Sequence, residues 1–313
     1  MREVLAVPFG WVLSGLYGIT DNYVLSIVLL TVIVKLLLLP ASISQQKNSA
    51  KQTRLNTKVN KIRQKYAGNQ QKIQEETQAL YQREGFSMGN MGCTTMFIPL
   101  FVMLGLYGVI YAPITKVLNF STATVEKIRD FMGIVVESNK SSRASLYYEL
   151  NILNKFSEYK DTLGEILSEA EIADLAKLKD NFMFLGIDLT QTPNTKEMNI
   201  LWLIPIFSCL TALASSLFMY MRQRKQNPEM AKNPSMGCMT FMSPAMSLWF
   251  TFIMPAGVGL YWIISNIISF IQQVVLTTLY SPKKVLAQQM VDETVARRSR
   301  ENNVKRRVEM EKK

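Results

Sequence analysis

Long apolar runs alternate with polar, mostly basic segments along the chain of 313 residues. The hydrocarbon core of a bilayer is about 30 Å thick, so a helix needs about 20 mostly apolar residues to cross it. Five segments meet or approach this length: residues 23–42, 93–113, 198–221, 236–254 and 257–279. A soluble protein would need amphipathic helices to cover so many apolar ones, and the sequence offers too few. The pattern therefore predicts an all-α membrane protein with five transmembrane helices.

Positive charge is concentrated in three of the polar segments. Lys and Arg outnumber Asp and Glu by nine to three in residues 41–92, by four to one in 222–235, and by ten to five from Ser281 to the end. Residues 114–197 have ten basic and thirteen acidic side chains instead. Because cytoplasmic loops carry an excess of Lys and Arg, the N-terminus is expected outside and the C-terminus in the cytoplasm.

The five spans divide the chain into ten parts. We expect an interfacial helix (1–22), the first span (23–42), a cytoplasmic helical hairpin (43–92), the second span (93–113), a helical extracytoplasmic segment (114–197), the third span (198–221), a cytoplasmic loop (222–235), the fourth span (236–254), the fifth span (257–279) and a basic cytoplasmic tail (281–313). The N-terminal stretch has no small-residue cleavage site, so we expect it to be retained, with Trp11 and Tyr17 at headgroup level.

Two of the polar parts are open to more than one interpretation. The hairpin breaks at AGNQ and has a narrow apolar seam, which suits a solvated linker as well as a docking surface. The basic tail suits a disordered solubilising end as well as a segment that binds anionic lipid or ribosomal RNA.

Composition removes several classes of chemistry. The chain has a formal charge of +11, no histidine and three cysteines, Cys93, Cys209 and Cys238, none close to another in sequence. A disulfide framework, a zinc site and histidine-based acid–base catalysis are therefore not expected. A Walker-type GxxxxGK[ST] motif is absent from the sequence as well. We predict no cofactor, no metal and no enzymatic activity.

Lys35 interrupts the first span within the run SIVLLTVIVKLLLLP. At a rise of about 1.5 Å per residue it lies about 18 Å from Tyr23, where the span starts. Thr31 lies one turn above it on the same face. The fifth span has a polar stripe at helical spacing, and its third member lies at the depth of Lys35. The stripe consists of Trp262, Asn266, Ser269 and Gln273.

Each of these polar features also has a simpler explanation. A lysine five residues before Pro40 can extend its stem to the headgroups, and Ser, Asn and Gln commonly form hydrogen bonds between helices. The five spans, however, contain no Asp or Glu. A lysine–carboxylate relay of the kind found in proton-coupled carriers therefore cannot form within the membrane. The sequence favours an unpaired cation that faces a polar, wet cavity.

An ordered set of motifs resembles the YidC/Oxa/Alb family of membrane protein insertases. The set is NYVLSIVLLTVIVKLLLLP, QQKNSAK, KIRQKY, QEETQALYQREG, GC followed after twelve residues by LY, NFMFLGIDLTQTP and GLYWIISNIISFIQQ. The resemblance covers most of the chain apart from about 114–178, and the ordered set is specific although each piece is weak. It implies five spans around a hydrophilic groove that is open to the cytoplasm and the lipid and closed to the outside.

The resemblance also assigns residues. Lys35 stands where the family typically has arginine, Thr31 is the polar residue one turn away, and Tyr261 and Trp262 are the aromatic residues of the fifth span. The chain departs from the family in three ways. Lysine at position 35 lacks the planar fork of the arginine that is usual there. The second span, GCTTMFIPLF, lacks the usual glutamine, and the segment 114–197 is longer than expected. We expect the form without the large N-terminal extracytoplasmic domain, which fits a bacterium with a single membrane.

The function implied by this resemblance is that of a membrane protein insertase and folding chaperone in the bacterial cell membrane. Its clients are nascent membrane proteins that pass into the lipid bilayer, and the ribosome and the Sec translocon are candidate partners. A small-molecule or ion transporter is the alternative, although the unpaired lysine and the missing inverted repeat speak against it. An intramembrane Ser/Lys hydrolase with Lys35 as base ranks third, because no serine has an evident nucleophile setting.

Overall fold

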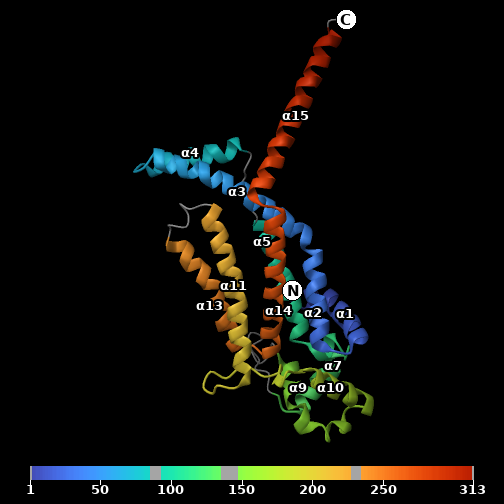
Figure 1. The fold of residues 1–313 in the computed structure, drawn as a ribbon. Helices are drawn as coiled ribbons and strands as arrows, with labels where there is room; N and C mark the ends of the chain where they lie inside the picture. The colour runs from blue at the N-terminus through green and yellow to red at the C-terminus, as the bar shows by residue number, and fades with distance from the viewer. Residues whose placement is uncertain (1, 85–92, 135–146, 227–233, 312–313) are drawn as a thin grey trace. The chain divides into compact units, whose positions relative to one another are not determined.

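The computed structural model describes residues 2–84, 93–134, 147–226 and 234–311. The chain forms two compact units, unit 1 of Met1–Leu37 with Met96–Phe270 and unit 2 of Leu38–Thr95 with Ile271–Lys313 (Figure 1). The end of the expected hairpin and half of the expected loop at 222–235 lie outside the described residues. The two units are described in turn.

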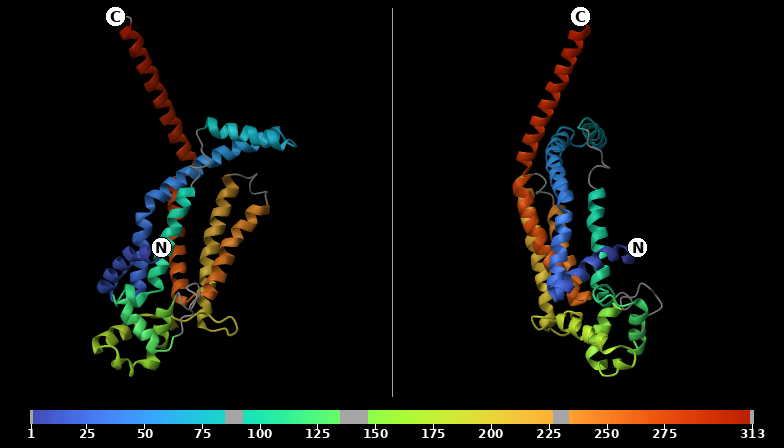
Figure 2. Two further views of the ribbon diagram at one scale, coloured as in Figure 1. Left: turned by 180° about the vertical axis from the view of Figure 1, so that it is seen from behind. Right: turned by 90° about the vertical axis from the view of Figure 1, so that its right-hand side faces the viewer.

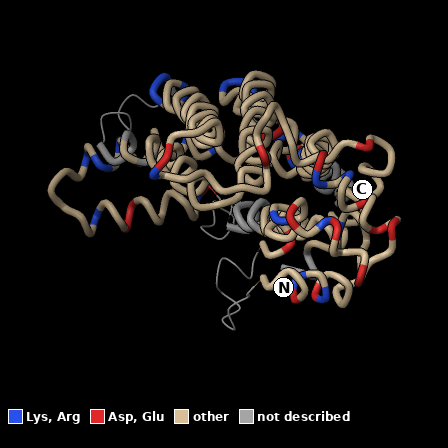
Figure 3. The backbone as a smooth tube through the Cα atoms, turned by 90° about the horizontal axis from the view of Figure 1, so that it is seen from below, with Lys and Arg blue, Asp and Glu red and all other residues tan. Residues whose placement is uncertain are grey.

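Long helices make up most of unit 1. They are α1 (Arg2–Thr20), α2 (Tyr23–Leu37), α5 (Cys93–Ile110), α11 (Leu203–Gln226), α13 (Pro234–Ile253) and α14 (Ala256–Leu279), with the first residues of α5 and the last of α14 assigned to unit 2. α11 and α13 lie side by side in both views of Figure 2. On α2, α5, α13 and α14 the only charged residue is Lys35, and α11 is charged only near its end. Figure 3 shows that Lys and Arg as well as Asp and Glu occur elsewhere along the chain. These helices therefore have the composition of segments that lie in lipid.

Two helical stretches of the described chain, Ile200–Lys225 and Ala256–Leu279, are each long and apolar enough to cross a membrane. α2 together with the helix that follows it counts as a third, interrupted span. Among the described residues the other apolar stretches, Ala6–Thr20, Phe101–Ile110 and Thr240–Ile253, are shorter. The architecture is helical and suited to a membrane, with two or three candidate spans by length and composition where five were expected.

The first apolar run does not form one continuous helix over the expected residues 23–42. α2 ends at Leu37, and α3 (Leu39–Lys65) begins two residues later with Pro40 in its first turn. Proline has no N–H, and its ring clashes with the carbonyl of the fourth residue before it, so it is tolerated at a helix start but not within the helix. Pro40 therefore accounts for the break, and the last residues expected in the span belong to the next helix.

Between α5 and α11, unit 1 contains short helices with buried apolar faces. They are α6 (Pro113–Lys116), α7 (Thr122–Phe131), α9 (Tyr148–Tyr159), η2 (Leu163–Glu165) and α10 (Glu169–Asn181). The last of these helices, α10, begins at Glu169. Ser168 and Glu171 form a capping box there, in which each side chain accepts a hydrogen bond from the backbone of the other residue.

A short β-hairpin follows α10, where no strand was expected. β1 (Met183–Phe184) pairs antiparallel with β2 (Ile187–Asp188). Leu185 and Gly186 form the turn between them with φ values of 51° and 79°. Two successive residues at positive φ are typical of a tight hairpin turn, for which Asn-Gly is the usual sequence signal. Leu-Gly supplies only the second half of that signal.

Unit 2 contains α3, α4 (Gln70–Arg83) and α15 (Pro282–Glu311). α4 folds back along α3 after a turn in which Gly68 has a φ of 91° (Figure 1). α15 begins beside α3, where Lys47 Nζ lies 5.3 Å from the centre of the Tyr280 ring and Val285 is buried. The tail is thus helical to Glu311, which differs from the disordered end that was one of its two interpretations.

Candidate functional site

Polar side chains of α14 form hydrogen bonds to three neighbouring helices of unit 1. Three members of the stripe each bond to a different helix: Trp262 Nε1 donates to Tyr107 Oη on α5, Asn266 Nδ2 donates to Thr211 Oγ1 on α11 at 3.3 Å, and Ser269 Oγ accepts from Lys35 Nζ on α2 at 2.7 Å. We call these six residues the polar seam. Hydrogen bonds between membrane helices contribute only about 0.6 kcal/mol on average. The seam therefore fixes the arrangement of the helices more than it adds stability.

Lys35 contacts the residue that lies at its own depth. Lys35 is twelve residues after Tyr23, and Ser269 is twelve residues after Gly257, so the two helices bring them to one level. The ammonium is directed at α14 and not along α2 past Leu37. This position differs from that of a lysine extended toward the headgroups.

The partner of Lys35 is a neutral hydroxyl. No ion pair between described residues includes Lys35, and α2, α5, α11, α13 and α14 contain no acidic residue. An ammonium has three donors, and keeping it away from bulk water without a counter-ion is costly. An anionic or strongly polar group that approaches this position is therefore attracted to it.

Two residues of the predicted site have other surroundings. Thr31 is buried, and its Oγ1 donates to the Ile27 carbonyl of its own helix at 2.7 Å. Threonine in apolar helices commonly satisfies its hydroxyl in this way, so the structure does not bring Thr31 into the seam. Gln273 belongs to unit 2, and it is related to Ser269 only by its spacing along α14.

Tyr261 and Trp262 pack α14 against its neighbours. Tyr261 is buried, and its ring meets that of Tyr107 edge-on with centroids 6.3 Å apart. The Trp262 ring meets that of Phe250 on α13 in the same manner at 5.6 Å. Edge-to-face pairs at these distances are favourable. Both aromatic residues therefore hold the helices that surround the seam.

Tyr107 and Thr211 belong to the seam although neither was among the predicted site residues. Tyr107 is the second residue of the LY motif after GC, so the resemblance included the position without assigning it a role. Thr211 is a polar residue within the apolar α11 and also donates to the Phe207 carbonyl at 2.9 Å. The sequence marks both positions, one by a motif and the other by a polar residue in an apolar helix. The periodicity of a single helix, however, does not identify which residue of another helix lies opposite.

Small residues allow α11 to approach two of its neighbours. Ser208 of α11 and Ser247 of α13 are buried and share a hydrogen bond of 2.6 Å. A Cβ added to Gly259 of α14 would lie 2.3 Å from Ile204 Cγ2 on α11. Close approach through small residues is typical of packed membrane helices. It keeps the two helices that supply Thr211 and Asn266 in contact.

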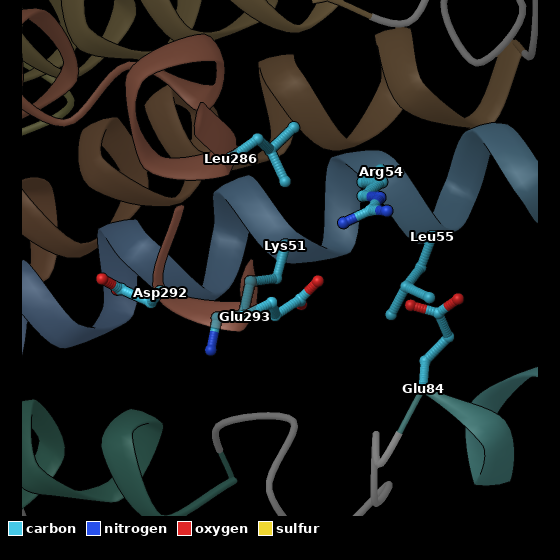
Figure 4. A pocket seen from close by; sticks show the side chains of 7 residues that line it. All are labelled: Lys51, Arg54, Leu55, Glu84, Leu286, Asp292 and Glu293. Carbon is cyan, nitrogen blue, oxygen red and sulfur yellow. The ribbon is translucent and has the colours of Figure 1, made fainter. Parts of the chain in front are cut away.

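A second candidate site is a pocket of about 230 Å³ in unit 2. It is lined by Lys51, Arg54, Leu55, Glu84, Leu286, Asp292 and Glu293. Figure 4 shows the two basic side chains on α3 and the neighbouring acidic pair on α15. Because charges of both signs surround the pocket, it has no clear preference for an anion or a cation.

Comparison with known proteins gives one family and a consistent set of relatives. The model of a family described as the 60Kd inner membrane protein matches residues 15–284. Membrane protein insertase YidC 2 of Listeria innocua is 23% identical over 287 residues, which cover 90% of this chain and 73% of that protein. Membrane protein insertase MisCA of Bacillus subtilis is 24% identical over 256 residues, which cover 80% of this chain and 69% of that protein.

Proposed function

The chain belongs to the 60Kd inner membrane protein family, and on this basis we propose that it is a membrane protein insertase and folding chaperone. It acts on nascent membrane proteins and moves their hydrophobic segments into the lipid bilayer. The relatives named above are called membrane protein insertases, which supports this assignment. The observation on which the mechanism rests is the contact of Lys35 with Ser269, a cation bonded to a neutral oxygen between two apolar helices.

The proposed arrangement has five spans, formed by α2, α5, α11, α13 and α14. The N-terminus lies outside and the C-terminus in the cytoplasm of a bacterial cell. This orientation is supported by the excess of Lys and Arg in residues 41–92 and in the tail from Ser281, and by the lack of such an excess in 114–197.

In the proposed mechanism a hydrophilic groove beside Lys35 receives the polar end of the client. Moving charge and unpaired backbone through hydrocarbon is the main barrier to insertion. Unit charges about 4 Å apart attract by about 4 kcal/mol at an effective dielectric constant near 20. An acidic or polar tail would therefore be drawn to Lys35 while the apolar segment of the client passes into lipid beside α14.

A small-molecule or ion transporter remains the second candidate function. The absence of Asp and Glu from the five apolar helices leaves no carboxylate to share a proton with Lys35. The test is to reconstitute the purified protein in liposomes and to measure two quantities. Insertion of a single-span client without ion flux supports the insertase, whereas substrate-independent ion flux without insertion supports the transporter.

Photo-crosslinking can locate the path of the client. Because Thr31 is buried, a photoreactive residue is better placed at Trp262, which is partly exposed and belongs to the seam. The matched control is Leu25, an exposed residue near the start of α2. We expect nascent chains with an acidic tail to crosslink from position 262 and not from position 25. Equal crosslinking from both positions would contradict a path along the seam.

The basic helices of unit 2 are the proposed contact with the ribosome, and the Sec translocon is a further candidate partner. We expect the triple variant in which Arg297, Arg298 and Arg300 are all changed to glutamine to weaken ribosome co-sedimentation. The slope of log affinity against log salt concentration should become shallower by about 2 to 3. The control changes the exposed Val291 and Val295 of α15 to glutamine, which leaves the charge unchanged. If the triple arginine variant has the same salt slope as the wild type, the tail does not contribute to ribosome binding.

A further inference from the structure

The segment Phe182–Gln191, which includes the β-hairpin, contacts the first turns of both α2 and α14. Phe182 is fully buried, and its ring stacks on that of Tyr23 at a centroid distance of 4.3 Å. Tyr23 is the first residue of α2. The start of α2 is thus attached to the segment by a stacked aromatic pair.

The attachment to α14 is made by backbone groups. Gly257 N donates to the Leu189 carbonyl and Ala256 N donates to the Gln191 carbonyl, both at 2.8 Å. The first N–H groups of a helix have no acceptor within the helix, so they need partners from elsewhere. The segment supplies two such partners and fixes where α14 begins.

Gly257 allows this close approach. A Cβ at this position would lie 3.3 Å from the Leu189 carbonyl oxygen and 3.9 Å from Cε1 of Phe182. The same glycine therefore lies next to both Phe182 and Leu189 of the segment, beside the aromatic pair with Tyr23. A Cβ here requires the Leu189 carbonyl, which accepts the hydrogen bond of Gly257 N, to shift by a few tenths of an ångström.

The segment itself is held in one shape. Leu189 N donates to the Phe182 carbonyl at 2.9 Å, which closes the hairpin. The Asp188 carboxylate accepts from Lys179 Nζ at 2.6 Å and from Thr190 N at 3.0 Å. Burial raises the pKa of Asp188, but these hydrogen bonds outweigh burial and leave the pKa below its usual value. The carboxylate therefore stays charged and keeps the hairpin attached to α10.

We propose that residues 182–191 clasp the start of α2 to the start of α14 and thereby position Lys35 against Ser269. The clasp joins Tyr23 to Gly257, and Lys35 and Ser269 each lie twelve residues further along their helices. Two attachments about 18 Å apart fix the rotation and the relative height of two rods, which one attachment cannot do. This inference rests on the proposed function, because it assigns the clasp a positioning role for the residue that attracts the client.

The first test measures the distance between α2 and α14 near Lys35. Spin labels are placed at Leu36 and Ile267, both exposed, in the full chain with its three cysteines changed to serine. We expect Phe182→Ala to shift or broaden the label distance distribution in nanodiscs. Gly257→Ala, which removes no side chain, should do the same. Met183→Ala is the control, because Met183 is half exposed and adjacent to Phe182. An unchanged distribution in both clasp variants overturns the proposal.

The second test asks whether the clasp acts through Lys35. Insertion of a client with an acidic tail is measured for Gly257→Ala, for Lys35→Leu and for the double variant at equal membrane abundance. We expect Gly257→Ala to reduce insertion by about two- to thirtyfold, the range of couplings through packed elements, and to cause no further loss in the Lys35→Leu background. The same loss in both backgrounds overturns a positioning role. Wild-type insertion by Lys35→Leu alone would refute the proposed role of Lys35, and no insertion by the wild-type protein would refute the proposed function. In both cases the label distances would still test the clasp.

Discussion

We expect Lys35→Leu to lower insertion of a single-span client with an acidic N-terminal tail by about tenfold or more, because it removes an attraction of up to about 4 kcal/mol between unit charges. Lys35→Arg should retain insertion, since arginine keeps the charge and adds donors. Lys35→Glu should be the most severe, because it repels the acidic tail. The measurement is protease protection of the client in proteoliposomes that contain equal amounts of each variant.

Two further variants separate the charge from other roles of this side chain. Ser269→Ala removes the neutral partner and leaves the cation, so most of the insertion should remain. The double variant Lys35→Leu with Leu37→Lys moves the lysine two residues toward the end of α2. A headgroup anchor would be restored by that change, whereas a cation that must lie beside Ser269 would not. Wild-type insertion by Lys35→Leu, or full rescue by the double variant, would refute the proposed role of Lys35.

The geometry around Lys35 was largely accessible from the sequence. Helical rise alone placed Ser269 at the depth of Lys35, and helical spacing put Asn266 and Trp262 on the same stripe. Their partners Tyr107 and Thr211 were not accessible, because they lie on helices whose rotation depends on packing. Periodicity also placed Thr31 on the face of Lys35. It could not show that the hydroxyl bonds to its own helix.

The clasp illustrates a different limit of sequence reasoning. Its contacts to α14 are made by the carbonyls of Leu189 and Gln191, and every residue type has a carbonyl. Leu185 adopts a positive φ that sequence patterns assign to Gly or Asn, so the hairpin was not expected. The helical tail was missed for a simpler reason: α15 is mostly polar, and this composition resembles that of a disordered segment, although its Lys, Arg, Glu and Gln are good helix formers.

We expect the second large effect from substitution of Glu149, which should lower the stability of the folded protein. This residue of α9 is buried, and its carboxylate accepts hydrogen bonds from Thr115 N at 3.0 Å and from Thr115 Oγ1 at 2.6 Å, in the first turn of α6. Glu149→Ala would remove the acceptor of both donors of the partly buried Thr115 and create a cavity. We expect it to lower the free energy of unfolding by about 2 to 4 kcal/mol. Thermal unfolding of the full chain in nanodiscs measures this change.

The charge on Glu149 also predicts a dependence on pH. Burial raises the pKa of Glu149, and the hydrogen bonds from Thr115 and the charge of the neighbouring Lys116 only partly oppose the effect of burial. A carboxyl whose pKa is higher in the folded state binds its proton more tightly there, so stability falls as pH rises from about 4.5 through the folded-state pKa. Glu149→Gln keeps one acceptor oxygen and cannot ionise, so its stability should be higher at neutral pH and should lack this component.

The control for this experiment is Glu158→Gln on the same helix, where the side chain is exposed. It should change the free energy of unfolding by no more than about 0.5 kcal/mol, as is usual for substitutions at the surface. Hydrogen exchange of the α9 amides, corrected for the intrinsic pH dependence of exchange, should show the pH-dependent loss of stability in the wild type and not in Glu149→Gln. Parallel pH profiles for the wild type and Glu149→Gln would show that the Glu149 carboxyl ionises with the same pKa in both states, and that burial in α9 does not disfavour its charge.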